Sequence, residues 1–315
     1  MLAYHRVGRV TTDPQLLCVT PEHFTEHLEL ITKHYDPARL DELVAATRPD
    51  RAVAVTFDDG YADTLLAAKP LLERASVHAT VFVATGCIRD GRRFWWDELE
   101  RLLLRPGRLP ATLSLDVNGE ILEWELGGDA AYPADRAIER FGWNVLDSRC
   151  PGPRQRIYRD LCARLRLLDD ARRDRVLGQL ASLADTDEAG ETPPPLTPSQ
   201  LRELAQGELI GIGAHTVTHP VLSQLAEEGQ REEVVGSKRE LEEAVDTRVT
   251  SFAYPYGGPT DFDETTVSVV RAAGFDCACS TVPGRLRRTT NAFRMPRVVV
   301  RDWSGEELQR VLVEA

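Results

Sequence analysis

Short apolar runs alternate along the chain with segments in which apolar residues recur at helical spacing. The runs at residues 51–57, 79–85 and 208–214 are rich in valine, alanine and isoleucine, which is typical of strands buried on both faces. Between them, as in residues 20–31, apolar positions recur every three or four residues. This alternation predicts an α/β fold in which helices surround a parallel sheet or barrel.

Capping residues mark the ends of the expected helices. Thr20-Pro21 and Thr197-Pro198 each place an N-cap hydroxyl before a proline at the first helical position. Gly274 follows a helical pattern and suits the left-handed conformation in which many helices end. Further strands are expected at residues 2–7, leading into 251–257, at 275–281 and at 296–301.

The stretch 94–196 interrupts this alternation. It holds four of the five tryptophans, many arginines and two segments with a helical pattern, at 158–168 and 171–183. It ends near Thr192–Pro195, where three consecutive prolines cannot continue a helix. We therefore interpret it as a mostly helical insertion or lid within a single catalytic domain that spans residues 1–315.

Length and charge limit the possible functions. The 315 residues suffice for one sizeable core with an insertion. The net charge of −12 repels nucleic-acid phosphates and anionic lipids, so we expect no nucleic-acid partner. The sequence has no apolar run of about 18 residues, the length of a membrane span, and no signal-peptide pattern at its start, which predicts a cytoplasmic protein.

The six cysteines are thinly spread and form no C-x-x-C motif. Cys277 and Cys279 alternate within an apolar run, so their side chains would share one face of a strand. We expect buried, reduced thiols rather than a disulfide framework or a zinc knuckle.

Two adjacent carboxylates, Asp58 and Asp59, follow the apolar run at 51–57. The carboxyl ends of parallel strands are where sheets and barrels form their ligand sites. Neighbouring carboxylates repel each other and lose hydration there, which costs stability unless a cation lies beside them. The pair alone leaves two interpretations open, a cation site or an ordinary Asp-Asp-Gly turn at the surface.

His215 and His219 follow the apolar run at 208–214. Their spacing would place both imidazoles on one face of a helical turn. Two neutral imidazoles and one carboxylate are a common ligand set for catalytic zinc, with one position left for water. His23 and His27 have the same spacing but lie in a helical pattern with no carboxylate pair nearby, and we expect them on a partly solvated helix flank.

Three segments carry the distinctive residues: Thr56-Phe-Asp-Asp-Gly60, His215-Thr-Val-Thr-His219-Pro220 and Phe252-Ala-Tyr-Pro-Tyr-Gly257. In order and separation they resemble the first three motifs of the polysaccharide deacetylases, the family-4 carbohydrate esterases with a NodB-homology domain. The resemblance implies a distorted (β/α)7 barrel. It implies Zn²⁺, or another divalent metal such as Co²⁺, Ni²⁺ or Mn²⁺, on Asp59, His215 and His219, with Asp58 as the general base.

The resemblance implies removal of an N-acetyl group from an amino sugar or glycan. The expected partner is therefore an N-acetylated sugar or glycan, bound as the substrate. An amide carbon is a poor electrophile, and a metal would both polarise the carbonyl and acidify bound water. Asp58 would take the proton of that water. The oxyanion would be held by the metal and by a backbone N–H near Tyr256 and Gly257. The Tyr256 ring could pack on a sugar or simply fill the core.

The third motif departs from the family pattern at one position. The family has an arginine after the motif's phenylalanine, which pairs with the catalytic aspartate, whereas this chain has Ala253. Arg297, just before the last expected strand, is our proposed substitute, against the alternative of an ordinary surface arginine. Asp302-Trp303 resembles a late Asp-Trp motif of the family, which makes Trp303 a candidate substrate contact.

The general acid is the second departure. Usual members have a late histidine, but no histidine follows His219 here. His5 ends the first expected strand in Leu-Ala-Tyr-His, which resembles the N-terminal Tyr-His of the poly-N-acetylglucosamine deacetylase branch, whose strand order looks circularly permuted. We therefore expect His5 to be the general acid, with a histidine that merely caps a strand as the alternative.

The leading hypothesis is a metal-dependent N-deacetylase, with an O-deacetylase or a deformylase acting on a sugar precursor as variants. A non-catalytic carbohydrate-binding relative, in which Ala253 marks lost activity, is the alternative from another class. Asp58 beside a complete set of metal ligands favours the enzyme, because a binding module has no need of that carboxylate. A metal phosphoesterase would need more carboxylates and a basic phosphate clamp, and the sequence has neither clearly.

Overall fold

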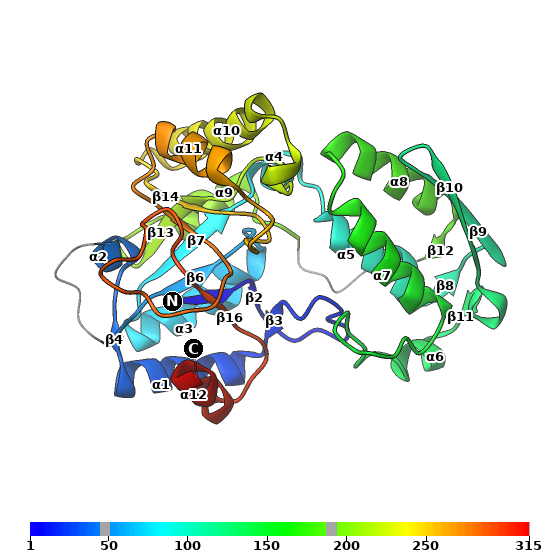
Figure 1. Ribbon diagram of the computed structural model, residues 1–315. Coiled ribbons are helices and arrows are strands. Elements are labelled where there is room, and N and C mark those ends of the chain that lie inside the picture. Colours follow the sequence, from blue (N-terminus) through cyan, green and yellow to red (C-terminus); the bar gives the residue numbers. More distant parts are fainter. Residues whose placement is uncertain (45–50, 187–193, 315) are drawn as a thin grey trace. The chain divides into compact units, whose positions relative to one another are not determined.

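The computed structural model describes residues 1–44, 51–186 and 194–314 (Figure 1). The chain forms two compact units, each described here by itself. The barrel unit comprises Met1–Arg9, Leu17–Arg92 and Pro193–Ala315, and the inserted unit comprises Val10–Leu16 and Arg93–Thr192. The sequence pattern did not assign the short segment Val10–Leu16 to the insertion.

Seven strands of the barrel unit form one parallel sheet, in the order β15-β14-β13-β7-β6-β1-β16. Their bounds are β1 Leu2–Tyr4, β6 Val55–Phe57, β7 Ala79–Val83, β13 Ile210–Ala214, β14 Ser251–Ala253, β15 Cys277–Cys279 and β16 Val298–Val299. The sheet curls into the distorted (β/α) barrel of NodB type that the sequence predicted (Figure 1). A parallel bridge between Cys279 and Met295 extends the β15 edge.

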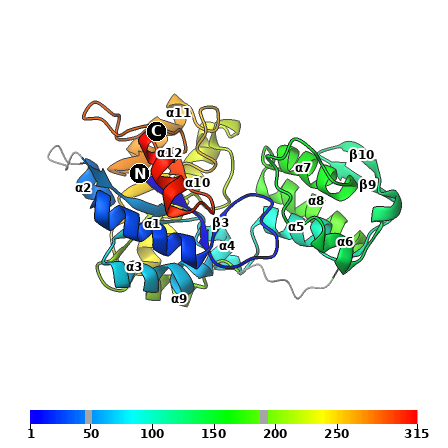
Figure 2. The same ribbon diagram turned by 90° about the horizontal axis from the view of Figure 1, so that it is seen from below.

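Helices cover the outside of the curled sheet. They are α1 Pro21–His34, α2 Leu40–Val44, the π-helical turn η1 Thr64–Ala68, α3 Lys69–Ala75, α4 Thr85–Asp90, α9 Pro198–Leu204, η3 Leu222–Gln224, α10 Glu227–Val245, α11 Glu264–Ala272 and α12 Gly305–Glu314. The helices α1 and α12 lie side by side (Figures 1 and 2). Two short parallel pairs, β2 Arg6–Val7 with β3 Cys18–Val19 and β4 Asp36–Pro37 with β5 Ala52–Val53, flank the sheet.

The three predicted helix caps are confirmed. The Thr20 hydroxyl accepts a hydrogen bond from the His23 N–H, and Thr197 forms a capping box with Gln200. Gly274 follows α11 with a φ of +78°. The strand expected at residues 2–7 is interrupted at His5, which lies between β1 and β2.

The two faces of the strands pack against different partners. One face, with residues such as Tyr4, Phe57 and Phe252, joins the large core formed with the helices. The other face lines the inside of the curl with a smaller cluster, which consists of Ala38, Leu40, Leu43, Ala54, Phe82, Ala253, Cys277, Cys279 and Met295. The two strand cysteines share this inner face as buried free thiols, as the alternation predicted.

The inserted unit has a hydrophobic core of its own, which includes Leu103, Leu113, Leu161 and Leu180. Its elements are α5 Trp95–Leu104, β8 Gly107–Arg108, β9 Thr112–Val117, β10 Glu120–Glu125, η2 Gly127–Asp129, β11 Ala131–Tyr132, α6 Ala134–Ile138, α7 Pro153–Leu165, α8 Asp170–Leu183 and β12 Asp185–Thr186. The helices are thus joined by short strands, which the apolar pattern of this stretch does not predict. Of the expected proline linker, Thr192 and Pro193 lie outside the described residues.

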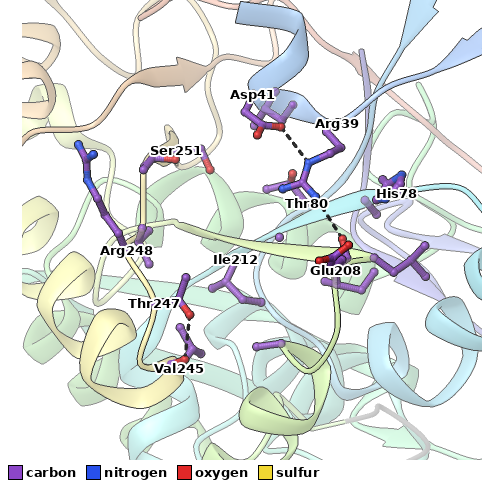
Figure 3. Close-up of a pocket in the computed structure, with 18 of the residues that line it drawn as sticks. Arg39, Asp41, His78, Thr80, Glu208, Ile212, Val245, Thr247, Arg248 and Ser251 are labelled. Carbon is purple, nitrogen blue, oxygen red and sulfur yellow. Dashed lines mark hydrogen bonds and ion pairs between the residues drawn. The ribbon is translucent and has the colours of Figure 1, made fainter.

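A pocket of about 740 Å³ opens at the amino-terminal ends of β7, β13, β14 and β15 (Figure 3). In it, Arg39 donates to Asp41 (Nε to Oδ1, 3.2 Å) and to the carbonyl oxygen of Glu208 (3.3 Å). The carboxylates and imidazoles singled out in the sequence follow the opposite, carboxyl-terminal ends, where barrels place their chemistry. The pocket is therefore separate from the candidate site. Within the described residues, no helix is both long and apolar enough to cross a membrane.

Candidate metal centre and catalytic residues

Three side chains from two strand ends of the barrel unit converge. Asp59 follows β6, and His215 and His219 follow β13. Nε2 of His215 lies 3.6 Å from Oδ1 of Asp59, and Nε2 of His219 lies 3.4 Å from the same oxygen. All three residues are buried, and one possible ligand atom from each lies within 4.8 Å of the others. This Asp59–His215–His219 group could hold a metal ion.

The spacing of these atoms fits a tetrahedral ion better than direct hydrogen bonds. Nitrogen–oxygen hydrogen bonds are about 2.7–3.2 Å long, so 3.4 and 3.6 Å are too long. Two ligand atoms that each lie about 2.0–2.1 Å from a tetrahedral Zn²⁺ are about 3.3–3.4 Å apart. Each histidine nitrogen therefore stands close to the distance from the Asp59 oxygen that a shared ion requires.

The protonation of His215 also suits a metal ligand. Its Nδ1 lies 2.8 Å from the carbonyl oxygen of Ala253, an arrangement in which Nδ1–H donates and Nε2 keeps its lone pair. Burial lowers the pKa of His215 to about 4, so the ring is neutral near pH 7. Ala253, which lacks the family's arginine side chain, thus orients the His215 ring through its backbone carbonyl.

The two adjacent aspartates have opposite electrostatic environments. Burial, above all, raises the pKa of Asp59; Asp58 adds to the rise, while His5 and His215 oppose it. Burial would also raise the pKa of Asp58, but the Arg297 guanidinium, with His215 and His5, outweighs it and lowers the pKa to about 2. Asp58 is therefore ionised at any physiological pH, whereas at Asp59 the nearby positive charges do not outweigh burial.

Arg297 and Asp58 form a fully buried bidentate ion pair. Nη1 and Nη2 of Arg297 each donate to one oxygen of Asp58 at 2.7 Å, and Arg297 is 0% exposed. The strand register places Arg297 level with Ala54. The Arg297 side chain therefore lies inside the barrel and extends toward the carboxyl-terminal ends of the strands. On the way Nη1 also donates to the Thr56 hydroxyl at 3.0 Å. The structure thus brings together the pair expected from the sequence, and the surface-arginine alternative is wrong.

His5 lies next to this pair, at the end of β1. Its ring interacts electrostatically with Asp58 and Asp59, and its buried Nδ1 has no hydrogen-bond partner among the described residues. Burial lowers the pKa of His5, although both carboxylates oppose that change. The imidazole is therefore neutral at rest.

The loop that carries the two histidines corrects one expectation. Residues 215–219 are not helical, and Thr216 and His219 have φ values of +67° and +56°. Asp59 is also left-handed, with a φ of +73°. A non-glycine residue in this region costs about 1 kcal/mol or more, and such strain clusters at functional sites. The imidazoles converge because the loop turns sharply, a conformation that residue spacing does not reveal.

The turn after β14 lies beside His219. The Tyr256 ring packs edge-on against the His219 ring, with centroids 4.8 Å apart, and Tyr256 has a φ of +60°. The N–H of Gly257 donates to the Pro255 carbonyl at 2.6 Å, and its own carbonyl accepts from Thr281 at 2.9 Å. The Gly257 N–H is thus already bonded within the turn.

Trp303 is tied to helix α1 rather than to the ligand group. Its carbonyl oxygen accepts a hydrogen bond from Nε2 of His27 at 2.7 Å, and Asp302 accepts from the Thr20 N–H and pairs with His23. In the described part of the chain, no hydrogen bond or ring contact of Trp303 reaches the Asp59–His215–His219 group. The expected solvated flank is wrong for His27, which is 0% exposed and also contacts the Tyr4 hydroxyl (3.2 Å).

Comparisons with known proteins identify the family of this chain. The family model described as "Polysaccharide deacetylase" matches residues 45–106 and 176–278, more than half of the chain. No curated protein sequence matches.

Solved structures share the fold at low identity. The deacetylase PplD of Streptococcus pyogenes, solved in complex with acetate, has a TM-score of 0.60 and 18% identity, over 98% of this chain and 96% of that one. IcaB from Ammonifex degensii has a TM-score of 0.58 and 18% identity, over 98% and 94%. BC0361, a polysaccharide deacetylase from Bacillus cereus, has 0.56 and 15%, over 99% and 67%. The family match and the shared fold support a carbohydrate deacetylase, and the chain belongs to the polysaccharide deacetylase family.

Proposed function

We propose that this protein is a metal-dependent hydrolase that removes an N-acetyl group from an amino sugar or glycan. The observation that carries the proposal is the Asp59–His215–His219 group with a second, ionised carboxylate, Asp58, beside it. A carbohydrate-binding relative without activity would need neither that second carboxylate nor the buried arginine that pairs with it, because a buried ion pair adds little net stability.

In this proposal, Asp59, His215 and His219 hold Zn²⁺ or a similar divalent ion. When bound, such an ion acidifies water and polarises the amide carbonyl. The remaining steps belong to the chain's own side chains. Asp58 accepts a proton from the attacking water, and Arg297 keeps the two carboxylate oxygens of Asp58 in a fixed orientation.

His5 is proposed to give a proton to the leaving nitrogen. Because burial keeps its imidazole neutral at rest, His5 must first take up a proton during the reaction. In the proposed sequence this is the proton that Asp58 has accepted from water, and the two aspartates nearby favour its uptake by His5. The alternative, a histidine that only ends a strand, would leave turnover unchanged in His5→Ala. Loss of turnover with unchanged metal content would support the acid role.

The turn at Tyr256 and Gly257 is proposed to line the acyl side of the site. The Gly257 N–H is bonded to Pro255, so the oxyanion contact is assigned to the backbone of the turn at Tyr256. The half-buried Trp303 follows β16 at the same end of the sheet, and we propose that its ring contacts the sugar.

The test combines metal analysis with acetate release. We expect the purified protein to bind one divalent ion, His215→Ala to lose it, and Asp58→Asn to keep it while losing most turnover. Candidate substrates are oligomeric, lipid-linked and nucleotide-linked N-acetyl sugars, with O-acetyl and N-formyl analogues to distinguish the variant activities. Full turnover in Asp58→Asn, or turnover unaffected by metal removal, would refute the mechanism.

A further inference from the structure

Helix α10 is hydrogen-bonded, through Glu233, to the loop that carries His215 and His219. One oxygen of Glu233, Oε2, accepts hydrogen bonds from the backbone N–H groups of Val217 (2.8 Å) and Thr218 (2.9 Å). The other, Oε1, accepts from the Thr218 hydroxyl at 2.6 Å. Three hydrogen bonds to one carboxylate hold the loop backbone in a defined direction.

These hydrogen bonds act on a strained segment. Thr216 and His219, on either side of the two bonded amides, both have left-handed backbone conformations. Within the loop, the Thr216 hydroxyl accepts from the His219 N–H at 3.1 Å, and on the other side the Gly86 N–H donates to the Val217 carbonyl at 2.8 Å. Non-glycine residues leave such conformations unless surrounding contacts hold them.

We propose that Glu233 is a positioning residue that sets the metal affinity of the Asp59–His215–His219 group. This inference rests on the proposed function, because it assumes that the group binds an ion. Glu233 contacts the loop backbone and not the ligand atoms, so it acts by keeping the two imidazoles where the ion needs them before binding. Loss of partners that orient metal ligands weakens affinity by about 10–100-fold.

The experiment measures Zn²⁺ affinity by competition with a chelator, using the full chain and no substrate. Glu233→Ala is expected to bind Zn²⁺ about 10–100-fold more weakly than the wild type. Glu232→Ala is the matched control, because it removes the same charge from an exposed neighbouring position of α10 and should leave affinity unchanged. At saturating Zn²⁺, acetate release by Glu233→Ala should recover, since the bound ion itself draws the ligands together.

Glu233→Gln separates positioning from charge. The amide oxygen can still accept from the two backbone N–H groups, and the Thr218 hydroxyl can accept from the amide nitrogen, so affinity should stay within about threefold of the wild type. An equally large loss in the Gln and Ala variants would mean that the negative charge attracts the ion, and would overturn the proposal. An affinity for Glu233→Ala equal to that of Glu232→Ala would also overturn it.

Two further variants keep the test decisive. If Glu233→Ala does not fold, Glu233→Asp retains the charge but withdraws the carboxylate by one methylene, and the same loss of affinity is expected. His215→Ala tests the proposed function itself. If His215→Ala binds Zn²⁺ as tightly as the wild type, the assigned ligand group is wrong, whatever the Glu233 variants show.

Discussion

The Asp58 carboxylate is buried in the barrel interior, where Arg297 binds it with two hydrogen bonds. Removing one partner of a buried ion pair leaves the other uncompensated, at a cost of about 3–5 kcal/mol. In Arg297→Ala, burial would then dominate and raise the pKa of Asp58 from its present value of about 2. Because the proposed mechanism requires ionised Asp58, the acidic limb of the pH–rate profile should move to higher pH.

A surface arginine provides the control for that variant. Arg294 pairs with Glu264 at 2.9 Å on the outside of the barrel unit, and Arg294→Ala should change neither stability nor the acidic limb appreciably. The stability and acidic limb of Arg297→Lys should lie between those of the wild type and Arg297→Ala. Lysine keeps the charge but cannot bind both oxygens of Asp58 with a planar guanidinium. An unshifted acidic limb in Arg297→Ala would show that Asp58 is not the group whose ionisation the reaction needs.

His27 makes a second prediction, on stability. Burial lowers its pKa to about 4, against 6.5 for an ordinary histidine, so between these values the unfolded chain binds more protons than the folded one. Stability should therefore rise with pH across this window, by up to about 3 kcal/mol from this residue. The free energy of unfolding can be measured with urea at pH 4.5, 5.5 and 7. In His27→Gln its rise over this range should be smaller than in the wild type by about that amount. The partly exposed His34 is the control, and an equal flattening in His34→Gln would contradict the assignment.

At the scale of elements, β13 depends on the small size of one of its two glycines. A Cβ on Gly213 would come within 2.4 Å of the Phe82 ring and 2.8 Å of the Ser251 hydroxyl, whereas a Cβ on Gly211 would have nothing nearer than the Thr80 hydroxyl at 3.5 Å. Gly213→Ala should therefore cost about 1–3 kcal/mol of unfolding free energy through overpacking. Gly211→Ala should be neutral or slightly stabilising. Equal unfolding free energies for the two variants would refute the argument.

The strands and the ends that carry chemistry could be predicted, because buried parallel strands are short apolar runs and polar residues at their carboxyl ends stand out. The conformation of the 215–219 loop could not. A helical turn and a sharp loop both bring residues four apart together, and the choice is made by tertiary contacts with Gly86 and Glu233. Glu233 itself lies in a charged helix whose pattern gives no sign of a special role.

Long-range pairing was predictable only where a resemblance supplied a missing partner. Ala253 leaves the proposed general base without the family's usual arginine, and that absence points to Arg297, which is 239 positions from Asp58. No comparable gap in the sequence indicates the links from His27 to Tyr4 and Trp303, so the pattern alone predicts a solvated flank for His27. Alternation of apolar and polar residues shows which face is buried, but not which polar group a buried histidine meets.

At the scale of the whole molecule, the family match and the two compact units divide the chain in related ways. The gap in the match, residues 107–175, lies within the inserted unit, which has its own core. The three side chains of the Asp59–His215–His219 group all belong to the barrel unit. A bound ion should therefore stabilise the barrel unit directly, and not the inserted unit.

Hydrogen exchange with and without Zn²⁺ tests that partition. An ion at about 100 times its dissociation constant stabilises the state that binds it by about 2.7 kcal/mol. Amides in β6, β13 and the loop at 215–219 should exchange more slowly when Zn²⁺ is present, whereas those around Leu103 and Leu161 should not change. His215→Ala should abolish the effect throughout. Equal slowing in both units would mean that the inserted unit shares the energy of the ion, so the site could not be assigned to barrel residues alone.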